Sequence, residues 1–221
     1  FSCDYYLPDM LVARCYRSPL PHARIKLIDS SEALKIPGVK AIITSEDFEN
    51  HGRFGFPIVD MYMLAYARVR FAGDPIVAVA AEDEDSLQAA LKALVVELEP
   101  LPGVFDPRNA LDSDAPLIGE NPRDAEGHPR GNLLIDYIVR QADPDTVLAK
   151  CDVVVDDEYT TMHQEHAYIE TEGAVAVPWS GNSGVTVYAG CQSPFNARDN
   201  LVRTLGLAEE DVRVIQPYVG G

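Results

Sequence analysis

One glutamine near the end of the sequence lies where a strand, a helix and a glycine pair could converge on a ligand. Gln192 follows a β-branched run and precedes Ser193 and Pro194, which are typical of a helix N-terminus. A second apolar run comes after this helix and leads to Gly220 and Gly221. A carboxamide both donates and accepts hydrogen bonds, and glycine lets backbone amides approach a ligand closely. The stretch therefore predicts a binding site made by Gln192, Gly220 and Gly221.

A segment further upstream carries residue types that bind metals. His163, Glu165 and His166 are too close together for the H-E-x-x-H arrangement of a helix. On a strand, the two histidines would point to opposite faces and could not easily share one ion. The sequence therefore predicts no metal ion that is directly ligated by side chains of this chain.

The elements that must position Gln192 belong to a predicted C-terminal domain of short strands and helices. Gly206 is placed to end the helix that starts at Pro194, and a turn over 181–184 joins two strands. The expected strands are 133–140, 153–159, 173–177, 185–188 and 212–215, with a short additional helix over 145–150.

The N-terminal part predicts a layered module with strands at 10–17, 25–28, 39–44, 76–81 and 95–98 and a helix over 86–93. Between the two parts, residues 111–132 are rich in Asp, Pro, Gly and Asn, a composition typical of linkers. The sequence thus predicts an α/β (α+β) fold with a first domain over 1–112, a linker over 113–131 and a second domain over 132–221.

Composition narrows the classes of partner. The chain has 221 residues with 18 Lys and Arg against 35 Asp and Glu, a net charge of −17 and a pI of about 4.5. Such acidity disfavours nucleic acid and anionic membrane surfaces, and no apolar run is long enough for a membrane span. The four cysteines are widely separated and form no C-x-x-C pair, so we expect reduced thiols, a cytoplasmic location and no iron–sulfur centre built from this chain alone.

Several segments, in order along almost the whole chain, carry a family resemblance. They are CQSPF and YVGG at the C-terminal end, LPDMLVARCYRSPLPHARI, PGVKAIITSEDF, VRFAGDPIVAVAAE and VELEPLPGVFDP in the first half, and HQEHAYIETEGAVA from His163. Together they resemble the molybdopterin-binding large subunit of the xanthine dehydrogenase/aldehyde oxidase family, which includes aerobic carbon monoxide dehydrogenase. The resemblance implies an α/β hammerhead domain followed by the first part of a molybdopterin-binding domain.

The resemblance also implies roles for particular residues. Gln192 matches a glutamine beside the molybdenum, and Gly220 and Gly221 match the first glycines of a GGGFGG loop. Further cofactor-site candidates are those that match the family's QEHFYLET-type segment: Gln164, His166 and Glu170. The metal of the molybdopterin cofactor, in some members a cytosine dinucleotide, would be held by the pterin's dithiolene sulfurs and not by Cys191.

The implied activity is oxidative hydroxylation of an aldehyde, purine, N-heterocycle or related carbon centre. The implied partners are the remainder of the large subunit, and 2Fe-2S and FAD on partner subunits or domains, in a dimer of heterotrimers. Because the family's general-base glutamate would lie beyond Gly221, we expect this chain alone to bind no cofactor stably and to be inactive. Two alternatives stay open: a non-catalytic interaction module of the hammerhead type, and one half of a split large subunit.

Overall fold

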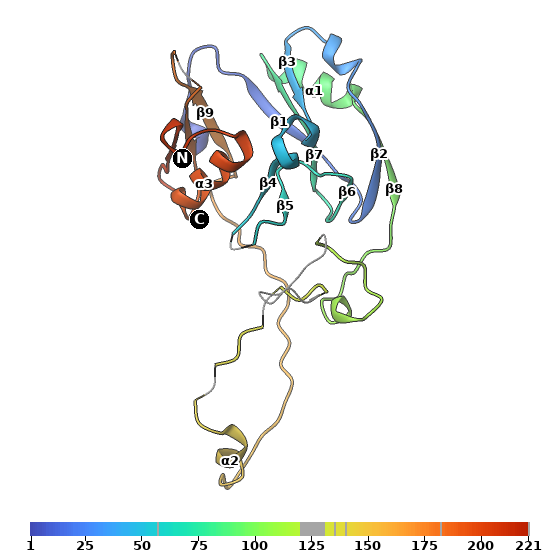
Figure 1. The fold of residues 1–221 in the computed structure, drawn as a ribbon, viewed down its shortest axis with the longest axis vertical. Helices are drawn as coiled ribbons and strands as arrows, with labels where there is room; N and C mark the ends of the chain where they lie inside the picture. Colours follow the sequence, from blue (N-terminus) through green and yellow to red (C-terminus); the bar gives the residue numbers. More distant parts are fainter. Residues whose placement is uncertain (57, 120–130, 135, 140, 182, 221) are drawn as a thin grey trace.

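The computed structural model describes residues 1–56, 58–119, 131–134, 136–139, 141–181 and 183–220. Figure 1 shows an N-terminal unit with most of the strands, a smaller C-terminal unit that contains both chain ends, and an arm that leads away from both. The arm comprises the described residues of 131–169, and α2 (Pro144–Leu148) lies at its tip. The architecture is mixed sheet and helix, as predicted.

The N-terminal unit contains two three-stranded antiparallel sheets and one long helix. The strand order is β1-β7-β3 in one sheet and β6-β2-β8 in the other, with a small β4-β5 pair beside them. The bounds of these elements are β1 Val12–Arg17, β2 Ala23–Asp29, β3 Val39–Ile43, β4 Arg53–Phe54, β5 Met61–Tyr62, β6 Arg68–Val69, β7 Pro75–Ala81, α1 Glu84–Ala93 and β8 Val95–Pro100. Short 3-10 turns lie at Ser2–Asp4, Ala33–Lys35, Ser45–Asp47, Glu49–Gly52 and Asn109–Leu111.

Helix α1 closes the core of this unit. The Asp83 side chain caps the helix by accepting a hydrogen bond from the Ser86 N–H at 2.7 Å, and this bond lowers the pKa of Asp83. Leu87 and Ala90 share one helix face and are fully buried against β7, whose Val77, Val79 and Ala81 are buried at every second position while Ala78 and Ala80 are partly exposed. The Asp83 cap thus starts the helix, and its apolar face holds it on the sheet.

The C-terminal unit is a three-stranded sheet of order β11-β10-β9 with one helix. β9 (Ala174–Pro178) and β10 (Val185–Ala189) pair antiparallel, and β10 and β11 (Val212–Ile215) pair parallel, joined through α3 (Pro194–Leu205) and a 3-10 turn at Glu209–Asp211. A parallel pair needs such a crossover connection. The predicted strands and helix of this region are confirmed.

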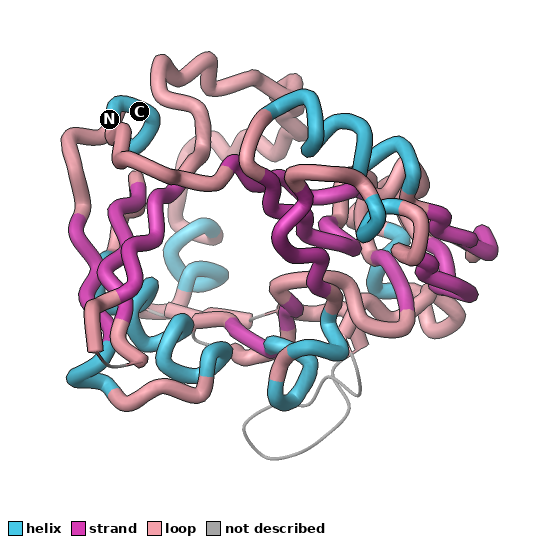
Figure 2. Tube along the Cα trace, turned by 90° about the horizontal axis from the view of Figure 1, so that it is seen from above, coloured by secondary structure: helices cyan, strands magenta, loops and turns pink. Residues whose placement is uncertain are grey.

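The first residues of the chain belong spatially to the C-terminal unit. The Tyr5 ring lies over the Tyr188 ring of β10, with centroids 4.5 Å apart. Figure 2 shows the two termini side by side at one end of this sheet. The two units also meet where the Gly55 N–H donates to the Asn200 side chain of α3 at 3.3 Å. N-terminal residues therefore support the site that the C-terminal residues form.

In the arm, the strands predicted from the sequence are wrong. The described residues of the predicted strands 133–140 and 153–159 form no strand and are exposed, whereas the predicted helix over 145–150 is present as α2. A strand needs a second strand for its backbone hydrogen bonds, and the described part of the chain supplies none there. Within the described ranges, no helix combines the length and the apolar character that crossing a bilayer requires.

The buried position of Leu87 leads to the first prediction. Leu87→Ala removes a fully buried side chain, so we expect the free energy of unfolding to fall by about 2–5 kcal/mol. Urea unfolding followed by circular dichroism measures this change. Leu34→Ala is the matched control, because Leu34 is 55% exposed and its truncation should change the stability by less than about 0.5 kcal/mol. Equal losses for the two variants would contradict this account of the core.

Candidate functional site

Gln192 is fixed between the end of one strand and the start of a helix. It follows β10 after two residues, and the next residue, Ser193, caps α3 by accepting from the Asn196 N–H at 3.5 Å. Pro194 occupies the first helical turn, and Gly206 ends the helix in the left-handed conformation with φ 65°. The predicted local setting of Gln192 is therefore present.

A second glutamine lies at the same edge of the sheet. Gln216 directly follows β11, which runs parallel to β10, so the carboxyl ends of the two strands bring Gln192 and Gln216 to one side. Both side chains line one cavity of about 310 Å³. The sequence reasoning missed Gln216, although its place after the second parallel strand repeats that of Gln192.

The cavity has a polar and partly acidic wall. Its described lining consists of Tyr168, Glu170, Thr171, Glu172, Gly173, Gly190, Cys191, Gln192, Gln216 and Val219. This lining contains two carboxamides and two carboxylates, and no Lys or Arg is among the described residues that form it. The pocket therefore offers neutral donors and acceptors to a ligand, without a cationic side chain.

Glu170 ties the wall of this cavity to both ends of the chain. Its Oε1 accepts from the Ser2 N–H at 2.8 Å and the Ser2 hydroxyl at 2.9 Å, and its Oε2 accepts from the Gly220 N–H at 2.9 Å. These bonds, the Ser2 N–H above all, lower the pKa of Glu170 and keep it ionised. The carboxylate of Glu170 therefore acts within the structure as an acceptor for two separate backbone segments.

Gly220 is packed against this same carboxylate residue. A Cβ atom added to Gly220 would lie 2.7 Å from the Glu170 Cβ and 2.9 Å from its backbone nitrogen, which is too close. The Gly220 carbonyl also accepts from the Ile169 N–H at 3.0 Å. Glycine is thus required here by packing against Glu170, while a cofactor role for Gly220 stays a prediction. Gly221 lies outside the described residues.

Two other predicted site residues lie away from the cavity. Gln164 and His166 are exposed in the arm, and neither lines the pocket. Within the described ranges, no group of three or more His, Cys, Asp or Glu side chains is placed to hold a metal ion. The roles predicted for Gln164 and His166 therefore stay predictions.

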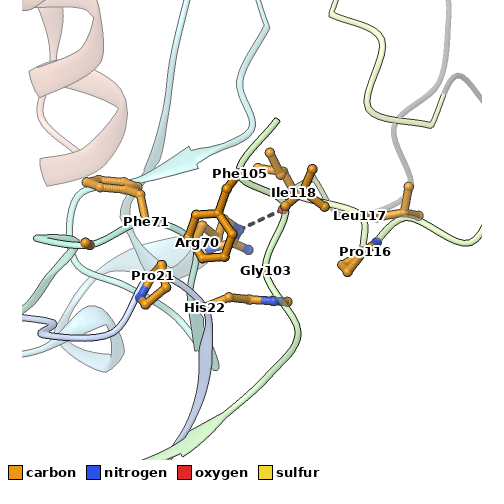
Figure 3. Close-up of a pocket in the computed structure, with 11 residues that line it drawn as sticks. Pro21, His22, Arg70, Phe71, Gly103, Phe105, Pro116, Leu117 and Ile118 are labelled. Atoms are coloured by element: carbon orange, nitrogen blue, oxygen red, sulfur yellow. Dashed lines mark hydrogen bonds between the residues drawn. The ribbon is translucent and has the colours of Figure 1, made fainter. Parts of the chain in front are cut away.

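A separate cavity of about 290 Å³ lies on the N-terminal unit (Figure 3). The exposed residues Phe71 and Phe105 line it, and the Arg70 Nε donates to the Ile118 carbonyl at 2.9 Å. Asn132 holds the same loop, because its side chain accepts from the Ile118 N–H at 2.9 Å. This cavity contains none of the predicted site residues and lies where the loop after β8 is fastened to the unit.

Comparison with known proteins agrees with the two-part architecture. Residues 1–102 match the family model described as "aldehyde oxidase and xanthine dehydrogenase, a/b hammerhead domain", and residues 127–221 match the model "molybdopterin cofactor-binding domain". The chain belongs to the xanthine dehydrogenase/aldehyde oxidase family. The predicted fold class is confirmed, and the predicted boundaries of 1–112, 113–131 and 132–221 stay predictions.

Individual members of the family are similar along the whole chain. The large molybdopterin subunit of nicotinate dehydrogenase from Eubacterium barkeri is 36% identical over 222 residues, which cover 100% of this chain and 50% of that protein. A probable xanthine dehydrogenase subunit from Bacillus subtilis is 35% identical, and the match covers 100% of this chain and 28% of that protein. The solved structure of reconstituted CO dehydrogenase from Oligotropha carboxidovorans has a TM-score of 0.84 at 31% identity. The match covers 100% of this chain and 29% of that chain. The chain thus spans half or less of the length of these relatives.

The family implies a molybdenum cofactor, and the lining of the Gln192 cavity fits one part of it. Gln192 and Gln216 present neutral amides, each of which can both donate and accept hydrogen bonds. They can therefore bind polar atoms of a ligand without adding charge to the site. The acidic Glu172 and the lack of Lys and Arg among the described lining residues do not fit a phosphate group. The cavity therefore suits the uncharged polar edge of such a cofactor, and its anionic end would need other residues.

The bonds of Glu170 lead to the second prediction. Because the folded pKa of Glu170 is below its ordinary value, its stabilising effect is complete above the ordinary pKa and is lost as the pH falls through the folded pKa. We expect Glu170→Gln to lower the melting temperature near neutral pH and to flatten its decline on the acid side. The Gly220 amide should also exchange with solvent about tenfold faster or more, because it loses a charged acceptor.

Melting curves between neutral and acid pH, together with hydrogen exchange at Gly220, measure these effects. Glu172→Gln is the control, since Glu172 is an exposed carboxylate on the same cavity wall. If Gly220 exchanges at the same rate in the parent and Glu170→Gln proteins, the carboxylate does not hold this loop.

Proposed function

We propose that this chain is the portion of a molybdenum hydroxylase catalytic subunit that carries the hammerhead domain and the first part of the molybdopterin-binding domain. The observation that carries the proposal is the position of Gln192 at the end of β10, in a cavity shared with Gln216, within a match to the cofactor-domain model. The match to the hammerhead model over the first part of the chain supports the same assignment.

The chain's own residues would position the cofactor. Gln192 would hydrogen-bond an oxygen atom at the metal centre or on the substrate, because a carboxamide does this without placing a charge there. Gln216 would bond a second polar atom from the neighbouring strand, and Gly220 and Gly221 would begin the glycine loop beside it. When bound, the cofactor would supply a two-electron oxidation in which a substrate C–H becomes C–OH with oxygen from water, releasing two protons and two electrons.

The proposed substrate is an aldehyde, a purine, an N-heterocycle or a related carbon centre. Relatives at 36% and 35% identity are named for nicotinate and xanthine, both of which are N-heterocycles, and this favours that class. Relatives are also named as subunits or chains of dehydrogenases, which supports the presence of partner subunits. That these partners carry 2Fe-2S and FAD, in a dimer of heterotrimers, is what the family resemblance implies. The four free thiols support a cytoplasmic location, and the family resemblance suggests the cytosine dinucleotide form of the cofactor.

The third prediction tests the role of Gln192. In the natural enzyme that contains this chain, we expect Gln192→Ala to lower kcat by about 10²–10³ while the molybdenum content stays unchanged. Gln88→Ala is the matched control, because Gln88 lies on α1, outside the cavity, and its change should leave turnover unaffected.

Turnover with a dye acceptor and metal analysis of the same samples measure both quantities. A natural protein that contains no molybdenum would overturn the assignment and favour an interaction module. Unchanged turnover of Gln192→Ala in a molybdenum-containing enzyme would remove Gln192 from the catalytic site.

A further inference from the structure

Helix α3, which begins directly after Gln192 and its capping residue Ser193, is packed against a loop of the N-terminal unit. This supporting loop, residues 49–55, comprises the 3-10 turn Glu49–Gly52, strand β4 and Gly55, and both its turn and β4 contact α3. Figure 1 shows α3 on the side of the C-terminal unit that faces β4. The helix that follows the candidate site glutamine is therefore supported by the hammerhead domain as well as by its own sheet.

One hydrogen bond joins the supporting loop to the middle of the helix. The Gly55 N–H donates to the Asn200 Oδ1 at 3.3 Å, and Gly55 is buried, so its N–H needs an acceptor within the protein. Asn200 lies in the middle of α3, on the order of 10 Å along the helix axis from Pro194. Because a hydrogen-bonded helix moves as one body, a restraint at Asn200 also restrains the helix start beside Gln192.

Only glycine fits the supporting loop where it reaches the helix. Gly55 has a φ of 146°, which residues with a side chain rarely adopt, and an added Cβ atom would collide with the carbonyl oxygen of Ile58. The contact to Asn200 is therefore made by backbone, whose position depends on the fold of the loop and not on the rotamer of a side chain.

The supporting loop is itself fixed on the core of the N-terminal unit. The Gly52 carbonyl accepts from the Met63 N–H at 3.1 Å. Close by in sequence, the buried Ala65 donates from its N–H to the carbonyl of Pro75, the first residue of β7, at 2.7 Å. Strand β7 is the central strand of its sheet. A continuous set of contacts thus leads from the hammerhead core through the loop to α3.

Two residues of the supporting loop hold an uncommon backbone conformation. Asn50 and His51 have φ values of 49° and 56°, in the left-handed region that favours glycine. The His51 ring stacks on the Tyr66 ring with the centroids 3.7 Å apart, which holds the turn in this shape. Such conformations persist where the surrounding structure determines them, and they are frequent at functional sites. The loop is therefore a preformed support for α3.

We propose that Asn200 is a positioning residue for the molybdenum site. Through the bond between Gly55 and Asn200, the hammerhead domain sets the place of α3 and thereby of the Gln192 amide. The inference rests on the proposed function, because it requires Gln192 to act at the reacting centre. The described residues that line the Gln192 cavity do not include Asn200, so Asn200 acts through Gln192.

The position of Gln192 should matter more for turnover than for substrate binding. A donor that stabilises charge in the transition state must lie at hydrogen-bond distance from it, and a misplacement of about 1 Å costs about 10²-fold in rate. Loss of the bond to Asn200 leaves α3 packed on β11 and on the supporting loop. We therefore expect a smaller displacement of Gln192 and a smaller loss of rate.

The fourth prediction concerns the turnover of Asn200 variants. In the natural enzyme that contains this chain, we expect Asn200→Ala to lower kcat about 10-fold, with KM changed less than about twofold and the molybdenum content unchanged. Asn200→Asp keeps an oxygen that can accept from the Gly55 N–H, so it should restore most of kcat. Arg203→Ala is the matched control, because Arg203 is exposed on the same helix and its change should leave turnover unaffected.

Hydrogen exchange measures the same contact without turnover. In these enzymes, the Gly55 amide should exchange about tenfold faster or more in Asn200→Ala, and at close to the parent rate in Asn200→Asp. Unchanged exchange in Asn200→Ala overturns the proposal, since the bond would then not hold the loop to the helix. Equal losses of kcat in the Ala and Asp variants also overturn it, because the oxygen acceptor would then not be the determinant.

A double-mutant cycle separates positioning from general damage to the enzyme. If Asn200 acts through Gln192, Asn200→Ala should lower kcat no further in an enzyme that already carries Gln192→Ala. The same loss of kcat in both backgrounds contradicts the positioning role, because Asn200 would then affect turnover by another route.

The same samples distinguish failure of the positioning role from failure of the proposed function. A natural protein without molybdenum, or full turnover of Gln192→Ala, overturns the proposed function and the positioning role with it. A molybdenum-containing enzyme that needs Gln192 but keeps its full kcat in Asn200→Ala overturns the positioning role alone.

Discussion

The carboxylate of Glu170 joins three parts of the chain that are far apart in sequence. It receives two hydrogen bonds from Ser2 and one from Gly220, and it lies at the point where the arm enters the C-terminal unit. Ser2 is buried, so its N–H and hydroxyl need acceptors inside the protein. An ionised carboxylate can accept several bonds at once, which a neutral side chain of the same size cannot do equally well. The wall of the Gln192 cavity depends on this one charged group.

The parallel pairing of β10 and β11 explains why two amides reach the same cavity. A strand–helix–strand connection places both strand ends at one edge of the sheet, and residues that follow those ends lie side by side. Gln192 and Gln216 occupy these two positions. In a chain with a net charge of −17, neutral amides can bind an electron-rich ligand that nearby carboxylates would repel. The geometry of the sheet therefore brings the two positions together, and the charge of the chain favours neutral amides at both.

The local setting of Gln192 was predictable because its determinants are close in sequence. Ser193, Pro194 and Gly206 define the ends of α3 through capping and a left-handed turn, and these need no knowledge of distant residues. The partners of Glu170 were not predictable in this way, since Ser2 is 168 residues away and Gly220 is 50 residues away. Gln216 is an intermediate case. The sequence pattern predicted the strand that precedes Gln216. The Gln216 side chain became a site candidate only when the parallel register of β10 and β11 was known.

The strands predicted in the arm do not form, for a physical reason. Alternation and β-branching report how well a segment suits a half-buried sheet, and they do not report which strand it pairs with. Helix hydrogen bonds close within one segment, which is why α2 and α3 form where they were expected, whereas a strand remains unformed until a second backbone lies beside it. In β9, β10 and β11 that second backbone lies within the described chain. The described part of the chain supplies no such backbone beside the arm. The local preference for a strand can therefore be correct although no strand forms there.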